Sequence, residues 1–259
     1  MKGLFQRLLG GRLVVVLIIF FMLIAALTVG LGALVTSRLI SDYMAQAETE
    51  QVERDMVLAK AFYQLKLDEV SAIGYRLALD AWVQENLEGA KQGDPEAVRI
   101  IDQQIINKIT VLALGGTHFI AVLDADGNIL VGRVLDRHDN LSSTITQGNW
   151  GQLPILQSVL SSGQAQKATE IVPAEFLSQV GLAEQAYIPL VETPLAAPYP
   201  FDPREGTAGL ALVGVRPLHD AHGRLQGAVL AMYLFNNDYT LVDRIKEVAG
   251  IDTVTIFLG

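Results

Sequence analysis

The chain has 259 residues, and its 28 Asp and Glu against 19 Lys and Arg give a formal net charge of −9. An acidic chain argues against a nucleic-acid-binding role, which needs a basic face. The chain contains no cysteine, so disulfides, zinc–thiolate sites and thiol nucleophiles are all excluded.

The most informative segment lies close to the N-terminus. The 25 residues from Leu13 to Ser37 carry no charge, and at about 1.5 Å rise per residue they can cross a hydrocarbon core of roughly 30 Å. The alternative is a cleaved signal peptide, whose apolar stretch covers only about 7 to 15 residues. Because this run continues as far as Val35 without a charged residue, we predict an uncleaved transmembrane helix over residues 13–37.

Charge asymmetry predicts the orientation of this helix. Residues 1–38 contain Lys2, Arg7, Arg12 and Arg38 and no acidic residue, so the rest of the chain carries a net charge of −13. By the positive-inside rule, residues 1–12 form a cytoplasmic N-terminus and the chain after the helix lies outside the cytoplasm.

After the membrane helix, apolar residues recur at steps of four and three, which is the spacing of a heptad seam. The seam consists of Val52, Met56, Ala59, Tyr63, Val70, Ile73 and Leu77, and Lys66 fills the remaining position. We therefore expect a stalk helix within residues 38–92, about 70 Å long if residues 42–88 are helical. Two interpretations stay open: a dimeric signalling stalk, or one helix that packs along its own domain.

Residues 93–236 carry the signals of a separate module. Asp94 and Pro95 suit the start of a helix that ends at Gly115-Gly116. A short helix is predicted over Pro154–Ser162, stopped by Gly163, and a last helix, capped by Asn236 or Asn237, closes at Gly250. Strands are predicted over residues 118–123, 129–134, 185–192, 209–218 and 225–235. This order predicts an α+β fold, with a five-stranded antiparallel sheet and helices on one face.

Several of these segments resemble a known family. They are the hairpin of residues 119–129 (Phe-Ile-Ala-Val-Leu-Asp-Ala-Asp-Gly-Asn-Ile), the late hairpin of residues 214–229, and residues 241–246 followed by 253–259. With the anchor and the stalk, they resemble the extracytoplasmic Cache (double-Cache, PAS-like) sensor domains of bacterial transmembrane receptors, over residues 38–259.

The resemblance implies a PAS-like sheet, placed outside the bacterial inner (plasma) membrane in the periplasm or extracellular space. It also implies a cytoplasmic output in the full-length protein, which would be a histidine kinase, a chemoreceptor or a cyclic-dinucleotide enzyme. We favour the histidine kinase of a two-component system, while the sequence itself chooses none of these outputs.

The C-terminal residues lead us to expect a fragment of a longer protein. Thr253–Leu258 alternates like a strand, yet no partner strand follows it. We expect residues 237–259 to be a linker helix and the first strand of a truncated membrane-proximal module, and the output domain to be missing. The competing interpretation is a complete membrane-tethered binding protein.

One turn has part of the spacing of a calcium loop. Asp124, Asp126 and Asn128 alternate as oxygen ligands would, but Ile129 and Leu135 stand where the loop needs Gly and a bidentate Glu. A plain hairpin turn is the better interpretation of this segment.

Other reactive residue types are scattered. His219 and His222 flank a turn without a carboxylate cluster to complete a zinc site. Neither a phosphate-binding loop nor a nucleophile elbow is present in the sequence. We predict no metal, no cofactor and no catalysis for this chain.

Ligand binding is the activity that we expect, because a PAS-like sheet with a long insertion (residues 136–184) makes a partly apolar pocket. The candidate ligand-binding residues are Arg133, Trp150, Tyr187, Phe201, Arg204, Arg216 and Tyr233. Each Arg is able to fork onto the carboxylate of an organic acid or amino acid, although a solvent-facing or structurally paired Arg is the more frequent case. The two Tyr residues lie in predicted strands, where they can be core. Phe201 and Arg204 lie in a proline-rich loop that either covers a pocket or simply connects two strands.

The predicted helices also suggest a homodimer. Ala26 and Gly30 lie four residues apart in the membrane span, a spacing that allows close helix contact. In our first hypothesis, ligand binding shifts the packing of the stalk and a dimer carries the shift across the membrane. In the second hypothesis, the chain is a tethered protein-interaction domain without a small-molecule ligand.

Overall fold

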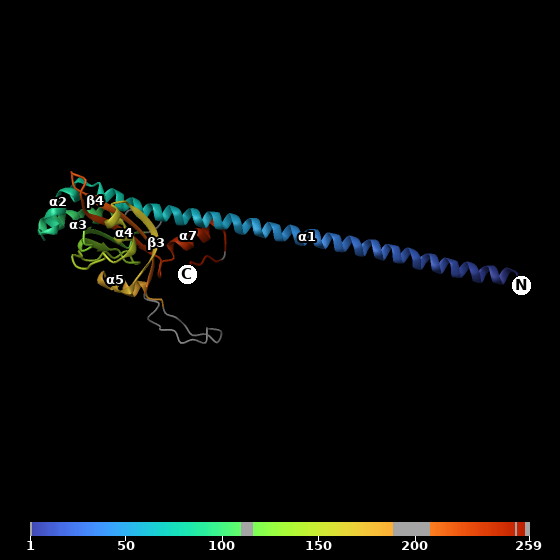
Figure 1. The fold of residues 1–259 in the computed structure, drawn as a ribbon. Coiled ribbons are helices and arrows are strands. Elements are labelled where there is room, and N and C mark those ends of the chain that lie inside the picture. The colour runs from blue at the N-terminus through green and yellow to red at the C-terminus, as the bar shows by residue number, and fades with distance from the viewer. Residues whose placement is uncertain (1, 110–115, 189–207, 252, 257–259) are drawn as a thin grey trace. The chain divides into compact units, whose positions relative to one another are not determined.

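The computed structural model describes residues 2–109, 116–188, 208–251 and 253–256. The chain divides into two compact units, Met1–Val57 and Leu58–Gly259. The predicted loop residues Phe201 and Arg204 lie outside the described residues, as do Gly115 and the end of the predicted C-terminal strand. Helix α1 (Lys2–Ala78) supplies residues to both units (Figure 1).

In the first unit, α1 exposes large apolar side chains around its whole circumference, as in Phe20, Phe21, Met22 and Leu23. This part of α1 is long and apolar enough to cross a membrane, and none of it is buried. An apolar, unburied helix of this length suits a lipid environment. The described residues contain one such helix, which fits a single-pass membrane protein.

The second unit is built on a five-stranded antiparallel sheet. Its strands are β1 (Phe119–Asp124), β2 (Ile129–Val134), β3 (Gln166–Val172), β4 (Gly209–His219) and β5 (Leu225–Leu234). They lie in the order β2-β1-β5-β4-β3. Two tight turns join β1 to β2 and β4 to β5, and in each turn an Asp carboxylate accepts backbone N–H groups: Asp124 from Asp126 and Asn128, Asp220 from His222 and Arg224. The α+β sheet with flanking helices confirms the predicted fold class.

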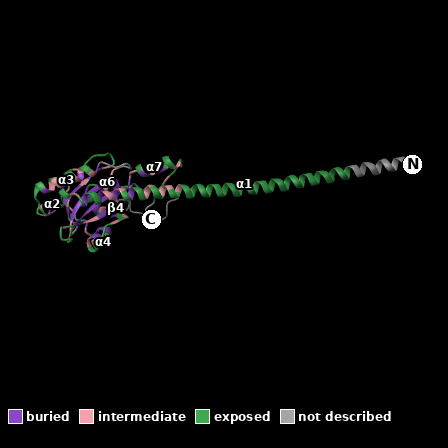
Figure 2. Ribbon diagram, turned by 90° about the horizontal axis from the view of Figure 1, so that it is seen from above, coloured by how far each residue is buried: buried purple, intermediate pink, exposed green. Residues whose placement is uncertain are grey.

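Helices cover both faces of the sheet. Successive side chains of a strand point to opposite sides, and apolar side chains on both sides are buried against helices. Ile120 and Val122 of β1 pack with the end of α1, with α2 (Ala81–Lys91) and with α3 (Pro95–Ile109). Phe119 and Ala121 pack on the other side with α4 (Pro154–Ser162), α5 (Ala174–Gln179) and α6 (Ala183–Ala186). Figure 2 shows the buried residues gathered in the interior of this unit, while the flanking helices carry both buried and exposed residues. The expectation of helices on one face was therefore wrong.

The third strand is not the predicted one. Residues 185 and 186 close helix α6, Tyr187 and Ile188 belong to no strand, and the rest of the predicted strand lies outside the described residues. The strand next to β4 is β3, which lies within the segment that we expected to be an insertion. β3 is at the edge of the sheet, and its alternate residues Lys167, Thr169 and Ile171 are exposed. An edge strand tolerates polar residues on its open side, which weakens its sequence signal.

The predicted stalk is broken once. Helix α1 ends at Ala78 and α2 begins at Ala81, because the Asp80 carboxylate accepts the backbone N–H of Trp82 at 3.0 Å and caps the new helix. The prediction of one continuous helix over residues 42–88 was therefore wrong between Ala78 and Ala81.

The heptad seam has two different environments. Lys66, Val70, Ile73 and Leu77 are buried, and they pack in the second unit against the sheet and helices α2 and α3. Val52 and Met56, the first two residues of the seam, stay exposed within this chain. The packed-helix interpretation is confirmed for the end of α1, while a dimeric stalk remains a prediction for the exposed half.

The helix ends predicted at Gly163 and Gly250 agree with the structure, the end predicted at Gly115 falls outside the described residues, and one predicted cap differs. Helix α4 ends at Gly163 and α7 (Thr240–Ala249) ends at Gly250, both in the left-handed conformation. Neither predicted Asn caps α7: its N-cap residue is Tyr239, which makes no side-chain capping bond, and Asp238 accepts the N–H of Thr240. Asn236 Oδ1 instead accepts the N–H of Leu210, and Asn237 donates to the carbonyl of Gln185. Residues 253–256 belong to no strand.

Candidate functional site

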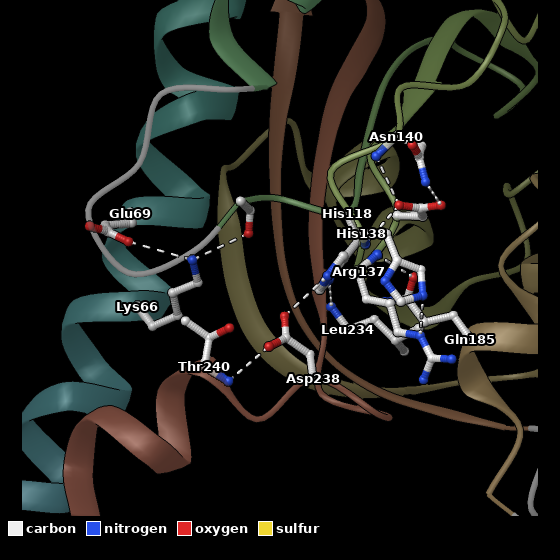
Figure 3. A network of polar contacts seen from close by, with 12 residues as sticks. Lys66, Glu69, His118, Arg137, His138, Asn140, Gln185, Leu234, Asp238 and Thr240 are labelled. Carbon is white, nitrogen blue, oxygen red and sulfur yellow. Dashed lines mark hydrogen bonds and ion pairs between the residues drawn. The ribbon is translucent and has the colours of Figure 1, made fainter. Parts of the chain in front are cut away.

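A buried polar network joins three parts of the second unit. His118 precedes β1, Tyr233 lies near the end of β5, and Asp238 precedes α7. His118 Nε2 lies 3.2 Å from Asp238 Oδ2, and His118 Nδ1 accepts the N–H of Leu234 at 2.9 Å. The His118 ring also stacks on Tyr233, with 5.0 Å between ring centroids. Figure 3 shows Lys66 of α1 on one side of this network and Asp238 beside α7.

Lys66 brings α1 into the network. Its side chain is 0% exposed, its Nζ lies 4.4 Å from the centroid of the Tyr233 ring, and it pairs with Glu69 Oε2 at 3.6 Å. Nζ also donates to the carbonyl of Gly116 at 3.4 Å. Burial lowers the pKa of Lys66, and the negative charges of Glu69 and Asp238 oppose that change. A buried ammonium is costly unless such groups surround it.

The pKa values of Tyr233 and Asp238 are changed in opposite directions. Burial raises the pKa of Tyr233 strongly, and the nearby charge of Asp238 adds to this effect. Tyr233 Oη has no hydrogen bond of normal geometry among the described residues. For Asp238, burial opposes ionisation, but the hydrogen bonds from His118 and Thr240 outweigh it and lower the pKa to about 2. The carboxylate therefore stays charged inside the domain.

The structure separates the predicted ligand-binding residues. Trp150 is buried against Phe119 and Phe176, on the sheet face covered by α4 and α5. Tyr233 belongs to the opposite face, covered by α1. Tyr187 is exposed and follows the last residue of α6. No one cavity of the described residues brings these three side chains together.

Arg133 is already paired. Its Nε and Nη2 donate to the two carboxylate oxygens of Asp102 on α3 at 2.7 and 2.6 Å, and its Nη1 donates to the carbonyl of Ser142. The hydrogen bonds that Arg133 donates to Asp102 raise the pKa of Arg133. This geometry favours the structural interpretation of Arg133 over ligand binding.

Arg216 on β4 is the predicted residue that lies in a groove. The groove has a volume of about 360 Å³ and is bounded by the end of α1, by Gln84 of α2, by the turn after α4 and by the end of β4. The Arg216 guanidinium carbon lies 4.4 Å from the centroid of the Tyr75 ring on α1. The groove is thus a concave surface with a cation on its wall.

The sequence did not indicate most of this site. His118 and Asp238 are isolated in the sequence, and their contact depends on the arrangement of the whole domain. Lys66 did give a signal, because it interrupts the apolar seam at a position that the fold buries. The turn residue Asp124 binds the backbone of its own turn, and the described residues contain no cluster of three or more metal-ligating side chains.

Comparisons with known proteins find similarity in solved structures only. No family model matches the chain, and no curated protein matches it. The sensor domain of the Vibrio cholerae histidine kinase DctB has a TM-score of 0.47 at 13% identity, covering 77% of this chain and 59% of that one. A domain of a sensory box/GGDEF family protein from Vibrio parahaemolyticus has a TM-score of 0.46 at 11% identity, covering 70% and 58%.

A third structure, the extracellular domain of histidine kinase vpHK1S-Z8, has a TM-score of 0.45 at 10% identity, covering 79% of this chain and 63% of that one. The chain therefore spans about three fifths of the length of these structures. Their descriptions name a sensory box protein domain, a sensor domain and an extracellular domain.

Proposed function

We propose that this chain is the membrane anchor and extracytoplasmic ligand-sensing region of a transmembrane signal-transduction receptor. One observation carries the proposal: α1 contains both an uncharged span of membrane length and a seam, from Lys66 to Leu77, that is buried in the folded domain. A helix that serves both purposes can transmit a change in domain packing. We assign residues 13–37 to the span, 38–92 to the stalk, 93–236 to the sensor module and 237–259 to a C-terminal linker segment.

The coupling would run through contacts that tie α1 to the sheet. Lys66 lies over Tyr233 of β5, and the backbone of α1 at Ser71 lies close to Gly214 of β4. A ligand that binds one packing of α1 better than another would shift the equilibrium between the two packings. The exposed seam residues Val52 and Met56 suit a second copy of the chain, so we propose a homodimer, with a histidine kinase as the output.

Orientation can be tested directly because the chain lacks cysteine. Gln6→Cys and Ala125→Cys each place one thiol, before the span and in the exposed β1–β2 turn. In intact cells, a membrane-impermeant maleimide should label Ala125→Cys and leave Gln6→Cys unlabelled until lysis. The reverse labelling would exclude an extracytoplasmic sensor.

Ligand sensing is tested on the full chain in lipid nanodiscs. We expect at least one compound among organic acids, amino acids and amines to raise the Tm, because a ligand that binds only the folded state stabilises it. The same ligand should change hydrogen exchange in residues 66–77. A folded chain that no small molecule stabilises would instead support the tethered protein-interaction domain.

A further inference from the structure

The groove beside Arg216 is positively charged on an acidic protein. Its lining includes Ala78, Gln84, Gly163, Arg216, Pro217 and His219, and no carboxylate is among the residues that line it. The chain as a whole has a net charge of −9. The groove is therefore a locally positive region on an acidic protein, and a locally positive region attracts anions.

The Arg216 guanidinium is held in place without being neutralised. It lies over the Tyr75 ring, a contact that orients the guanidinium plane by cation–π attraction. It forms no hydrogen bond or ion pair with any of the residues that the structure describes, whereas Arg133 uses its donors on Asp102 and Ser142. The forked N–H groups of Arg216 thus remain available to a carboxylate or phosphate.

The remaining lining suits a small organic molecule. Ala78, Leu79 and Pro217 supply apolar surface, and Gln84 and Gln164 supply side-chain amides. Gln84 Nε2 donates to the carbonyl of Ala78 at 2.7 Å, which fixes this side chain and leaves its Oε1 as an acceptor. The volume of about 360 Å³ falls in the range of roughly 300–1,000 Å³ that is typical of small-molecule sites.

We propose that this groove binds a small organic anion whose carboxylate lies on the guanidinium of Arg216, with its remainder on Gln84 and the apolar wall. The inference rests on the proposed sensing function and names the ligand class and the place. The groove touches the last residues of α1 and the first turns of α2, on either side of the break at Asp80. An occupant would therefore connect β4 to the junction between these helices, which is where a change in α1 packing can begin.

The test titrates the full chain in nanodiscs with glutarate, propionate and inorganic phosphate by calorimetry. We expect binding of at least one carboxylate, and a loss of affinity of about tenfold or more in Arg216→Ala, since a charge-assisted fork is removed. Arg216→Lys should lie in between, because it keeps the charge and loses the fork. Ala165→Trp should block the groove while Arg216 is intact. Arg76→Ala is the matched control, because Arg76 is an exposed Arg of α1 that does not line the groove, and it should bind like the wild type.

Three outcomes would overturn the inference. One is a bound carboxylate whose affinity is unchanged in both Arg216→Ala and Ala165→Trp. Another is phosphate binding in place of carboxylates, which would assign the groove to a different anion. The third is binding of none of the probes. If a compound from the wider screen stabilises the wild type and Arg216→Ala equally, the assignment of the ligand site to this groove is wrong, while the proposed sensing function is supported.

Discussion

His118 and Asp238 form a hydrogen bond that fixes the tautomer of the imidazole. His118 Nδ1 accepts the N–H of Leu234 at 2.9 Å, so that nitrogen carries no proton. The proton is therefore on Nε2, which lies 3.2 Å from Asp238 Oδ2 and donates to it. The pair ties the residue before β1 to Asp238, which also accepts the N–H of Thr240 at the start of α7.

Removal of the Asp238 carboxylate should destabilise the domain. Asp238→Ala leaves the buried N–H of His118 and the first N–H of α7 without their acceptor. We expect the free energy of unfolding to fall by about 2–3 kcal/mol, measured by urea denaturation of the full chain in detergent. The control Asp243→Ala, an exposed acid in the first turn of the same helix, should change it little. Equal losses in both variants would contradict the assigned role.

Acid should weaken the same contact within a defined pH window. The pKa of Asp238 falls from an ordinary 3.8 to about 2 in the folded chain, so the native state binds fewer protons than the unfolded state between these values. Its stabilisation is complete above about pH 4 and is lost as the pH falls toward 2. Between pH 5 and 2, the free energy of unfolding should therefore fall more steeply with decreasing pH in the wild type than in Asp238→Asn. Parallel curves would show that this carboxylate is not the titrating group.

Two glycines on the α1 face should respond oppositely to the same substitution. A Cβ on Gly214 of β4 would lie 2.7 Å from the Cα of Ser71, so Gly214→Ala has to push α1 away from the sheet. We expect a loss of about 1–3 kcal/mol in unfolding free energy. A Cβ on Gly74 of α1 meets only ordinary contacts from 3.8 Å, and Gly74→Ala should stabilise by about 0.5–1 kcal/mol through helix propensity. Denaturation of the two variants side by side checks both signs.

Arg133 should matter for stability and not for ligand affinity. Arg133→Ala leaves the carboxylate of Asp102, which is 11% exposed, with only the hydroxyl of Thr144 among its present side-chain donors. We expect a loss of about 2–3 kcal/mol. Any ligand found in the screen should bind the folded variant with unchanged affinity. A large loss of ligand affinity in a folded Arg133→Ala protein would instead show that Arg133 is a ligand-binding residue.

Trp150 should behave as a core residue. Its ring is 4.8 Å from Phe119 and 5.5 Å from Phe176 between centroids, and its Nε1 has no partner among the described residues. Trp150→Ala should therefore cost about 3–5 kcal/mol. Trp150→Phe should cost much less, since it keeps the aromatic packing and loses no hydrogen bond. Trp82→Ala, at a position 58% exposed, is the control and should unfold like the wild type.

Local chemistry made much of the fold predictable from the sequence. The β1–β2 and β4–β5 turns follow from Asp and Gly residues whose side chains and backbone serve the turn itself. Gly163 and Gly250 end their helices because they reach the left-handed conformation readily. Strand β3 escaped prediction because its pairing with β4, and not its own composition, makes it a strand.

The candidate site was less predictable, since contacts between distant residues decide it. Arg133 and Arg216 are equivalent candidates in the sequence. Arg133 donates its guanidinium N–H groups to Asp102, 31 residues away in the sequence. Arg216 lies over Tyr75 in a groove, and its N–H groups stay available to a ligand. No local pattern distinguishes these two environments.

The sequence by itself determined an apolar helix of membrane length, the charge asymmetry around it and the α+β class, because hydropathy and periodicity are properties of neighbouring residues. The tertiary structure alone decided which half of the heptad seam is buried, why Lys66 can lie inside the domain and which arginine faces a groove. Those outcomes depend on burial and pairing, and both arise only when helices and strands distant in the chain pack together.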